Sequence, residues 1–506
     1  MIQTRMWKKM FLLTVIAVGL LTIPPGGPAC AAEDRDTLII AVESDPATFD
    51  LLYAESMLEG QIGNNIYDNL LFIDDDGNIH PYLAEKYEIS PDGLEYTFHL
   101  KKGVKFHNGD EMKASDVAFT MEYGKKTPYM SVVCSNINKI DVIDDYTVKL
   151  TLASTMASFL SEVAGDQFPI YSEKAVKAVE TYGANPVGTG AYKFVSRKPG
   201  EEVRFEAFAD HFQGAAPIKN LIYRIIPDSF SAGVALETGD VDFIWVTNAS
   251  VAATLKDNKN ITVRSEPTNR IQFIRMNTEK EPFKDAKLRR AVNYALNRDV
   301  IVETVYEGYG APQDSLAIPW MAGFAEPAVR YSYDPEKAAA LAKEAGVSKE
   351  SPIVVELNCA GPTQRDAEVI QENLAEIGIN AKINLLEPNT IWTYDDDGNF
   401  QISVGGYYMV FKDMNIMTHF YDSVNIGSGN AARYNNPKTD KLLLDGRHEV
   451  DPQKRTEIYK QFIDIVQEDA PYAAYANRYV IRAYKADLNI SRTFANGIFI
   501  RDVSWK

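Results

Sequence analysis

The order of apolar and polar side chains in residues 84–123 predicts two strands and then the start of a helix. Residues 96–101, Tyr-Thr-Phe-His-Leu-Lys, alternate between apolar and polar, as in a strand that buries one face. Residues 104–107 alternate in the same way after a Lys-Gly turn, so the two segments are predicted to form a hairpin. The helix is expected to begin near Ser115 or Asp116, because both residue types favour the N-cap position.

Farther along the chain, the pattern switches repeatedly between the period of a strand and that of a helix. Residues 36–42 form an apolar run typical of a buried first strand, and residues 288–298 place their apolar side chains on one face of a helix. Residues 352–357, 367–377 and 378–383 predict a strand, a helix and a strand. This β-α-β order indicates a parallel sheet and therefore an α/β fold.

The length of the chain indicates several domains. With 506 residues, the chain is too long for a single hydrophobic core, so we expect two or three domains. Its composition, 45% hydrophobic and 24% charged, is that of a globular protein with a large core.

The N-terminus has the features of a signal peptide. Three basic residues precede an apolar run over residues 10–23, which is too short for a stable membrane anchor, and Ala29-Cys30-Ala31 offers a cleavage site. We expect residues 1–31 to be removed and the mature chain to lie outside the cytoplasmic membrane. The alternative is that Cys30 carries a lipid anchor, although Gly27 stands where a lipobox has a large aliphatic residue.

Charge and cysteine content restrict the partners further. Removal of residues 1–31 takes away three positive charges and no acidic residue, so the formal net charge moves from −18 to −21. Such a protein would repel nucleic acid, and we predict no nucleic-acid partner. Cys134 and Cys359 remain in the mature chain, and we expect both to be buried, unpaired thiols.

Two acidic runs invite a calcium-binding interpretation that their spacing does not support. Residues 74–78 and 395–399 both read Asp-Asp-Asp-Gly-Asn. Neither matches the EF-hand loop pattern, so we interpret both as tight acidic turns. The six His are scattered, and no metal site or cofactor is predicted.

Several motifs together resemble one protein family. The run from Ser90-Pro91-Asp92-Gly93 through residues 96–109 to Ala114-Ser115-Asp116-Val117 resembles the signature of the bacterial extracellular solute-binding proteins of the peptide/nickel type, family 5, which serve ABC importers. Met276-Asn277-Thr278 and the helix at 288–298 match the same family. Recognisable matches run from about residue 36 to about residue 482.

The resemblance implies an architecture. It is an α/β fold with the two lobes of a periplasmic binding protein (type II, cluster C), an extra subdomain in lobe I and a two-strand hinge. With residues 1–31 as the signal peptide, lobe I takes residues 32–272 and 480–506, and lobe II takes residues 275–477. The extra subdomain covers about residues 76–190.

The resemblance also places the ligand-discriminating stretch at residues 405–415. In peptide-binding members, a glycine–aromatic pair at a strand end leads to an acidic residue that holds the peptide's α-ammonium group, and Gly406-Tyr407 and Asp413 match these positions. A buried cation needs an anion within hydrogen-bond reach. The alternative is that Asp413 pairs with Lys412 or with a solvent partner.

Tyr408 and Asn415 are further candidate ligand contacts in this stretch. Because side chains alternate along a strand, only one of Tyr407 and Tyr408 can face the ligand.

Two departures separate the chain from simple dipeptide binders. Pro388 stands where those relatives have a ligand-stacking Trp, and Trp392, one turn farther on, is either its substitute or a core residue. Arg365 is a candidate partner for a peptide carboxylate, but it is out of register with the Arg of the relatives. The sequence therefore indicates the family more firmly than the ligand.

We interpret the chain as the substrate-binding component of an ABC importer. It would capture a small peptide or peptide-like solute in the cleft between the lobes by hinge closure, as a monomer, and deliver it to permease subunits in the membrane. A non-peptide solute, such as a nickel chelate, an oligosaccharide or an amino-acid derivative, is the alternative within the family; His419 lies near the ligand stretch, but a lone His is more often structural. A secreted hydrolase is the alternative from another class, disfavoured because the G-x-S-x-G and H-E-x-x-H motifs are absent.

Overall fold

The computed structural model describes residues 35–506 except 54–56, 75–76, 128–129, 166–167, 180–181, 410–411, 492 and 495–496. The predicted signal peptide and Cys30 lie outside the described residues. Residues Asp36–Lys506 form one structural unit. Within the part of the chain that is described, no helix is long and apolar enough to cross a membrane.

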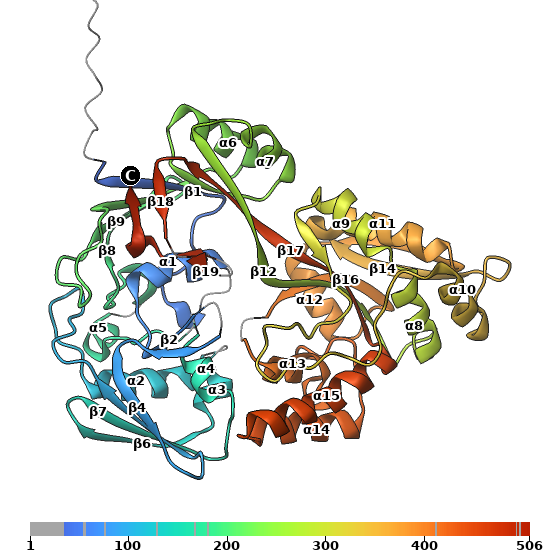
Figure 1. Ribbon diagram of the computed structural model, residues 1–506, viewed down its shortest axis with the longest axis horizontal. Coiled ribbons are helices and arrows are strands. Elements are labelled where there is room, and N and C mark those ends of the chain that lie inside the picture. The colour runs from blue at the N-terminus through green and yellow to red at the C-terminus, as the bar shows by residue number, and fades with distance from the viewer. Residues whose placement is uncertain are drawn as a thin grey trace, which may run out of the picture. The chain divides into compact units, whose positions relative to one another are not determined.

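An eleven-stranded mixed sheet runs through this unit (Figure 1). Its strands, in spatial order, are β15 (Ile379–Leu386), β14 (Ile353–Ala360), β16 (Ile402–Tyr408), β12 (Ile261–Met276), β17 (Tyr472–Lys485), β11 (Phe243–Val246), β1 (Thr37–Val42), β10 (Asn220–Ile225), β9 (Glu202–Ala207) and β8 (Tyr192–Lys198). Strand β13 (Gly310–Pro312) pairs with β17 off this path. The predicted first strand is β1, which lies parallel to both β10 and β11.

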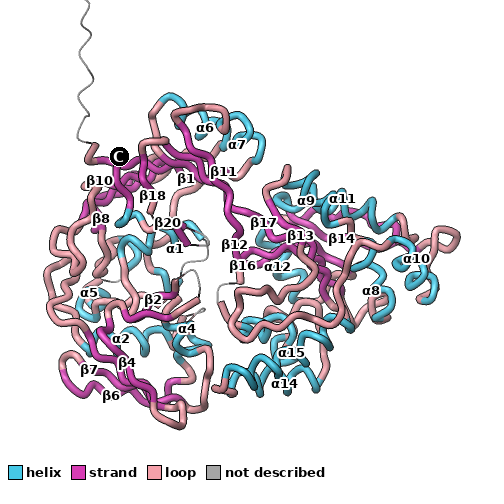
Figure 2. The backbone as a smooth tube through the Cα atoms, in the orientation of Figure 1, coloured by secondary structure: helices cyan, strands magenta, loops and turns pink. Residues whose placement is uncertain are grey.

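Strands β12 and β17 join two groups of elements, as Figure 2 also shows. They are antiparallel from Ile261 opposite Lys485 to Arg275 opposite Tyr472, and their register shifts after Pro267, which has no N–H to donate to the ladder. On one side of this pair, buried apolar residues cluster within 38–261 and 481–503; on the other side, they cluster within 271–476. We call the two groups the first and the second lobe.

Of the two strands predicted for the hairpin, the first is present, and the prediction of the second, at residues 104–107, is wrong. Strand β5 (Glu95–Leu100) buries Tyr96, Phe98 and Leu100, and it pairs with β4 (Ala84–Ile89) and β7 (Thr147–Leu152) in a four-stranded sheet completed by β6 (Ile137–Asp144). Residues 104–107 form no strand and contain one isolated bridge, from Lys105 to Glu111. Their alternation arises because Val104 and Phe106 are buried in the core of the first lobe without a strand ladder.

The helix after this segment begins slightly earlier than predicted. Helix α2 (Ala114–Gly124) has Lys113 as its N-cap, and the Asp116 carboxylate accepts a hydrogen bond from the Lys113 N–H at 2.9 Å. The acidic residue therefore caps the helix from inside its first turn.

Helices lie in both lobes. In the first lobe they are α1 (Met57–Ile66), α2, α3 (Ser131–Cys134), α4 (Phe159–Val163), α5 (Glu173–Lys177), α6 (Ser229–Thr238) and α7 (Ala249–Leu255). In the second lobe they are α8 (Ala286–Ala295), α9 (Arg298–Tyr306), α10 (Pro335–Glu344), α11 (Gln364–Ala375), α12 (Pro388–Asp396), α13 (Met417–Tyr421), α14 (Pro437–His448) and α15 (Pro452–Asp469). The predicted β-α-β unit is confirmed as β14, α11 and β15, with β14 and β15 parallel.

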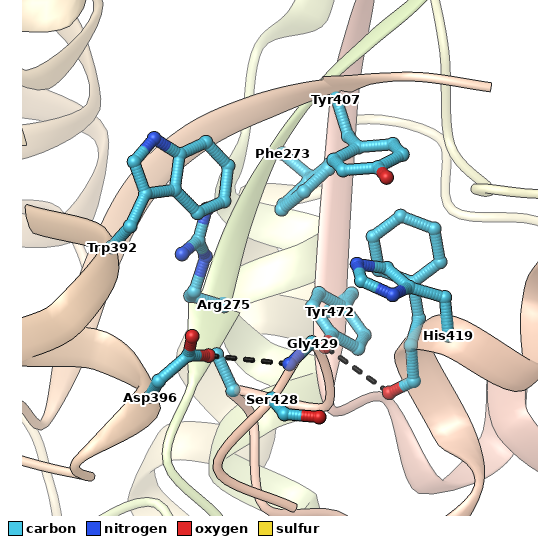
Figure 3. A pocket seen from close by; sticks show the side chains of 11 residues that line it. Phe273, Arg275, Trp392, Asp396, Tyr407, His419, Ser428, Gly429 and Tyr472 are labelled. Carbon is cyan, nitrogen blue, oxygen red and sulfur yellow. Dashed lines mark hydrogen bonds between the residues drawn. The ribbon is translucent and has the colours of Figure 1, made fainter. Parts of the chain in front are cut away.

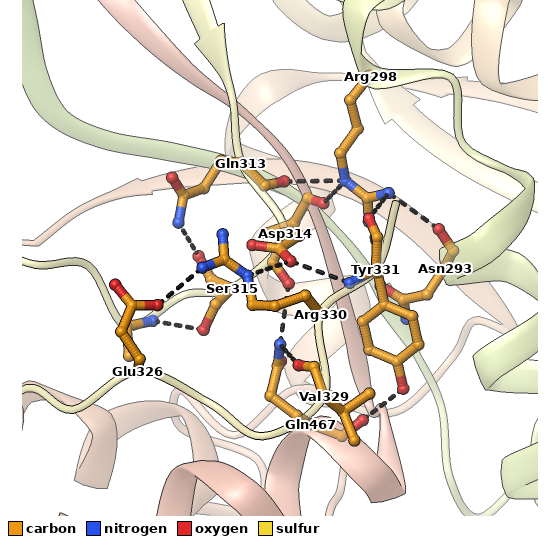
Figure 4. A network of polar contacts seen from close by, with 12 residues as sticks. Asn293, Arg298, Gln313, Asp314, Ser315, Glu326, Val329, Arg330, Tyr331 and Gln467 are labelled. Carbon is orange, nitrogen blue, oxygen red and sulfur yellow. Dashed lines mark hydrogen bonds and ion pairs between the residues drawn. The ribbon is translucent and has the colours of Figure 1, made fainter. Parts of the chain in front are cut away.

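The long segment between β13 and α10 has little regular structure, and a polar network holds it in place (Figure 4). The buried guanidinium of Arg298 donates to the carbonyl oxygens of Gln313 at 3.0 Å and Tyr331 at 2.9 Å. The Asp314 carboxylate accepts from Arg330 at 2.7 Å and from the Tyr331 N–H at 3.0 Å. Hydrogen bonds of this kind replace the ladder that a strand would supply.

Cys134 and Cys359 are both buried and unpaired, as predicted. Burial raises the pKa of the Cys134 thiol to about 12 and that of Cys359 to about 11. Both side chains are therefore neutral thiols at physiological pH.

Two glycines allow side chains of β12 to lie across β16. A Cβ atom on Gly405 would stand 2.2 Å from Nη2 of Arg275, and one on Gly406 would stand 1.6 Å from Oε1 of Gln272. The Arg275 guanidinium needs this space because it forms a buried ion pair with Asp395 at 2.6 Å.

We expect Gly405→Ala to lower the free energy of unfolding by about 1–3 kcal/mol, because the added methyl group must displace Arg275 from its buried partner. Urea unfolding would measure this loss. Gly60→Ala in α1 is the matched control, since its Cβ would meet no atom within 4 Å. Equal midpoints for Gly405→Ala and the wild type would contradict the packing described above.

Candidate functional site

A pocket of about 380 Å³ lies in the second lobe, next to the long strands (Figure 3). Strands β12, β16 and β17, helices α12 and α13, and the loop at 428–431 form it. Its lining residues are Phe273, Arg275, Trp392, Asp396, Tyr407, His419, Phe420, Ser428, Gly429, Ala431 and Tyr472. The volume is in the range of small-molecule sites.

Aromatic side chains form most of the wall. The ring of Tyr407 lies 5.0 Å from that of His419 and 5.1 Å from that of Phe420, measured between centroids. Trp392 is 44% exposed and lines the pocket, so it is not a core residue. Such walls can bury an aliphatic or a planar group.

The positive charge of Arg275, which lines the pocket, is paired with a carboxylate. Arg275 is almost fully buried and donates to Asp395, whose side chain is fully buried. Its guanidinium also lies 4.8 Å from the ring of Trp392. The ion pair is thus compensated inside the protein, and it fixes the floor of the pocket next to Trp392.

His419 is a neutral wall residue. Burial, with a smaller contribution from the nearby positive charge of Arg275, lowers the pKa of His419 to about 4. The loop reaches its ring closely because residue 429 is glycine: a Cβ there would stand 2.4 Å from the imidazole. At neutral pH the imidazole therefore carries no charge.

Asp396 is the acidic side chain on the pocket wall. It ends α12, is partly exposed, and accepts a hydrogen bond from the Gly429 N–H at 3.3 Å (Figure 3). The acidic turn predicted over residues 395–399 begins later than expected, because α12 extends through Asp396 and places Asp395 in the core.

The two predicted tyrosines face opposite ways. Tyr407 lines the pocket, whereas the ring of Tyr408 lies against the guanidinium of Arg270 at 4.9 Å. The expectation that only one of them faces inward is thus consistent with the strand geometry of β16. Gly406 is buried beside Gln272 and is not a lining residue.

Asp413 lies outside the pocket lining and has an internal partner. Its two carboxylate oxygens accept hydrogen bonds from Arg455 at 2.6 Å and 2.8 Å, and one of them also accepts from the Asn415 N–H at 2.7 Å. Lys412, considered as a partner from the sequence, instead donates to the carbonyl oxygen of Asp74. A role for Asp413 at a ligand's ammonium group stays a prediction.

Asn415 and Arg365 also lie elsewhere. Asn415 is buried, and its amide donates to Glu162 of the first lobe at 3.0 Å while its oxygen accepts from Arg447 at 3.1 Å. Arg365 is exposed in the first turn of α11 and does not line the pocket.

Sequence reasoning missed several wall residues. Phe273, Arg275 and Tyr472 lie on strands that meet only through tertiary pairing, so no local pattern links them to the ligand stretch. Asp396 lies in a run of three aspartates, and the sequence alone does not indicate which of the three faces a pocket. Across the described residues, no group of three or more His, Cys, Asp or Glu side chains is arranged to hold a metal ion.

Comparisons with known proteins agree with the fold. Residues 78–428 match the model of the bacterial extracellular solute-binding proteins, family 5 (middle part). The chain is 29% identical over 480 residues to heme-binding protein A of Haemophilus influenzae, with 88% of each chain covered. It is 30% identical over 497 residues to the dipeptide-binding protein of Escherichia coli, covering 90% of this chain and 92% of that protein.

A solved structure extends the agreement to three dimensions. The periplasmic binding protein DppA of Helicobacter pylori, an ABC transporter-associated protein in complex with the peptide STSA, superposes with a TM-score of 0.80 at 26% identity, covering 93% of this chain and 98% of that one. The α/β fold of a two-lobed periplasmic binding protein (type II, cluster C), predicted from the sequence, is confirmed. Because the family match covers most of the sequence, the chain is a solute-binding protein rather than an enzyme, and it belongs to family 5 of the bacterial extracellular solute-binding proteins.

Proposed function

We propose that this protein captures a small peptide or peptide-like solute in the pocket of the second lobe and delivers it to the permease of an ABC importer. The observation that carries the proposal is the aromatic pocket beside β12 and β17, in a chain whose relatives include a dipeptide-binding protein and a peptide-bound transporter component. Trp392 and Tyr407 would contact the solute's apolar parts.

Capture would proceed by closure of the lobes. Lobe I, residues 32–272 and 480–506, would move against lobe II, residues 275–477, and β12 and β17 would serve as the hinge. A solute that lies in the pocket of the second lobe and also contacts the first lobe would stabilise the closed arrangement by its higher affinity for that arrangement.

Polar contacts between the lobes support this mechanism. Glu162 of α4 is 1% exposed, and it accepts hydrogen bonds from Ser158 at 2.6 Å and from Asn415 at 3.0 Å. Arg447 donates to the other end of the Asn415 amide. We call Glu162, Asn415 and Arg447 the interlobe clasp.

Further hydrogen bonds flank the clasp. The Ala157 N–H donates to the carbonyl oxygen of Arg447 at 2.9 Å, and the Thr155 hydroxyl donates to that of His448 at 3.1 Å. The same elements of the two lobes thus meet in several places beside the clasp.

Localisation follows the family. We propose that the mature protein acts as a monomer outside the cytoplasmic membrane, in the periplasm, after cleavage behind residue 31. A lipid anchor on Cys30 is the second possibility, and mass spectrometry of the purified mature chain would distinguish the two by the added acyl mass.

A panel of solutes tests the function directly. Native mass spectrometry of protein purified without denaturation should reveal a retained solute, and peptides should raise the melting temperature, since a ligand that binds only the folded state stabilises it. If sugars or metal chelates stabilise the protein and peptides do not, the peptide proposal is refuted. Turnover of a peptide would refute binding without catalysis.

We expect Tyr407→Ala to weaken peptide binding about tenfold or more, because the pocket loses a large aromatic wall. Isothermal titration would measure the change. Tyr408→Ala is the matched control, since that ring lies on the opposite face of β16 against Arg270. Equal losses in both variants would show that the pocket is not the binding site.

The clasp predicts a pH dependence. Burial raises the pKa of Glu162 to about 7 where it meets Asn415 of the second lobe; Asp413 raises it further, while the hydrogen bonds from Ser158 and Asn415 and the positive charge of Arg447 oppose the rise. Separated lobes would return the carboxyl to water and its pKa toward about 4.3. Closure would then take up a proton between these two values, so peptide affinity should increase as the pH falls from 7.5 to 5.

Glu162→Gln should remove this part of the pH dependence, because the amide stays neutral in both arrangements. Titrations at several pH values would compare it with Glu85→Gln, an exposed residue of the same lobe. Other charged groups around the clasp, Asp413 with Arg455 and His448, are present in both variants, so the difference isolates Glu162. An unchanged pH profile in Glu162→Gln would refute the coupling.

A further inference from the structure

The pocket of the second lobe has an unbalanced negative charge. The charge of Arg275 is matched by Asp395 at 2.6 Å, and His419 is neutral. Arg433, whose guanidinium donates to the backbone oxygen of Asp396 at 3.2 Å, is matched by Glu279 at 2.5 Å. The carboxylate of Asp396 therefore remains as the net charge on the wall.

The surroundings of Asp396 favour the binding of a cation. Its carboxylate accepts one hydrogen bond from a neutral backbone N–H, that of Gly429. A carboxylate accepts several hydrogen bonds, so it can bind a ligand's N–H groups in addition. Trp392 lies one helical turn away on α12 and lines the same pocket, and an indole face also attracts cations.

Asp413, the carboxylate singled out from the sequence, has a different environment. Arg455 binds both of its oxygens, and both residues are buried. A ligand's ammonium group would have to share this carboxylate with a guanidinium that already satisfies its charge.

We propose that Asp396 binds the positively charged group of the solute, while the solute's apolar part packs against Trp392, Tyr407 and Phe420. The solute class is then a peptide-like molecule with a cationic group next to an apolar or aromatic group. This inference rests on the proposed function, and it names the residue that selects for charge. The cation could be an α-ammonium group or a basic side chain, which share the same chemistry at the carboxylate.

Paired peptides separate the two sources of charge. Ala-Phe-Ala and its N-acetylated form differ in the α-ammonium group, and N-acetyl-Lys-Phe-Ala and N-acetyl-norleucine-Phe-Ala differ in the side-chain cation. For the wild type, we expect removal of the charge to weaken binding about tenfold or more in at least one pair, as measured by isothermal titration. A smaller change in both pairs would overturn the proposal.

Variants then assign the effect to a residue. Asp396→Asn keeps an acceptor for the Gly429 N–H, and it should reduce the charge-dependent ratio to about threefold or less. Asp397→Asn, the exposed neighbour with the same change of charge, should keep the wild-type ratio. Equal ratios in these two variants would overturn the role of Asp396.

Asp413→Asn provides the opposing test. It should keep the ratio, and a loss there with none in Asp396→Asn would return the ammonium group to Asp413. If Asp413→Asn fails to fold, Asp413→Leu combined with Arg455→Met removes both buried charges and leaves the comparison intact. Binding that does not depend on charge overturns this inference alone, whereas binding of no peptide at all overturns the proposed function and this inference with it.

Discussion

The antiparallel pairing of β12 with β17 is the interaction on which the rest of the structure depends. It brings residues about 200 positions apart in the chain into one ladder, from Ile261 opposite Lys485 to Arg275 opposite Tyr472. At one end it continues into the sheet of the first lobe, and at the other its side chains form the pocket floor. A bend of this ladder at its register shift near Pro267 would move the lobes while each core stays packed.

The pocket inherits its chemistry from a buried ion pair. Arg275 and Asp395 are costly to bury and are tolerated because their opposite charges pair, and two glycines in β16 leave room for the side chains of β12. The pair therefore contributes shape and a flat contact for Trp392, and no net charge. The charge of a solute is therefore recognised by the residues around this ion pair. A single neighbouring carboxylate can determine whether the pocket binds cationic or neutral solutes.

The sequence predicted the helices and strands better than the lining of the pocket, for a physical reason. Periodicity is local, so β5, α8 and the β14-α11-β15 unit could be located from their own residues. The strand expected at 104–107 was wrong because burial of alternate side chains does not require a ladder. Asp413 and Arg455 pair across 42 positions, and the interlobe contact of Asn415 with Glu162 spans 253 positions, which no local pattern reports. The resemblance to the family supplied the long-range arrangement of the fold that local patterns do not report. It did not predict the partners or the burial of individual side chains.

Three adjacent aspartates show that the local environment of a side chain, and not its residue type, determines its role. Asp395 is buried and paired, Asp396 lies on the pocket wall, and Asp397 is exposed after the helix ends. The formal charge of −18 for the whole chain has little influence inside the pocket, because salt screens exposed charges beyond about 8 Å at physiological ionic strength. A partly buried carboxylate next to an aromatic wall is screened much less, and a solute must replace the water that solvates it. Selectivity for charge in this protein is therefore a property of the position of one side chain at the end of α12, and it can differ among relatives that share the same fold.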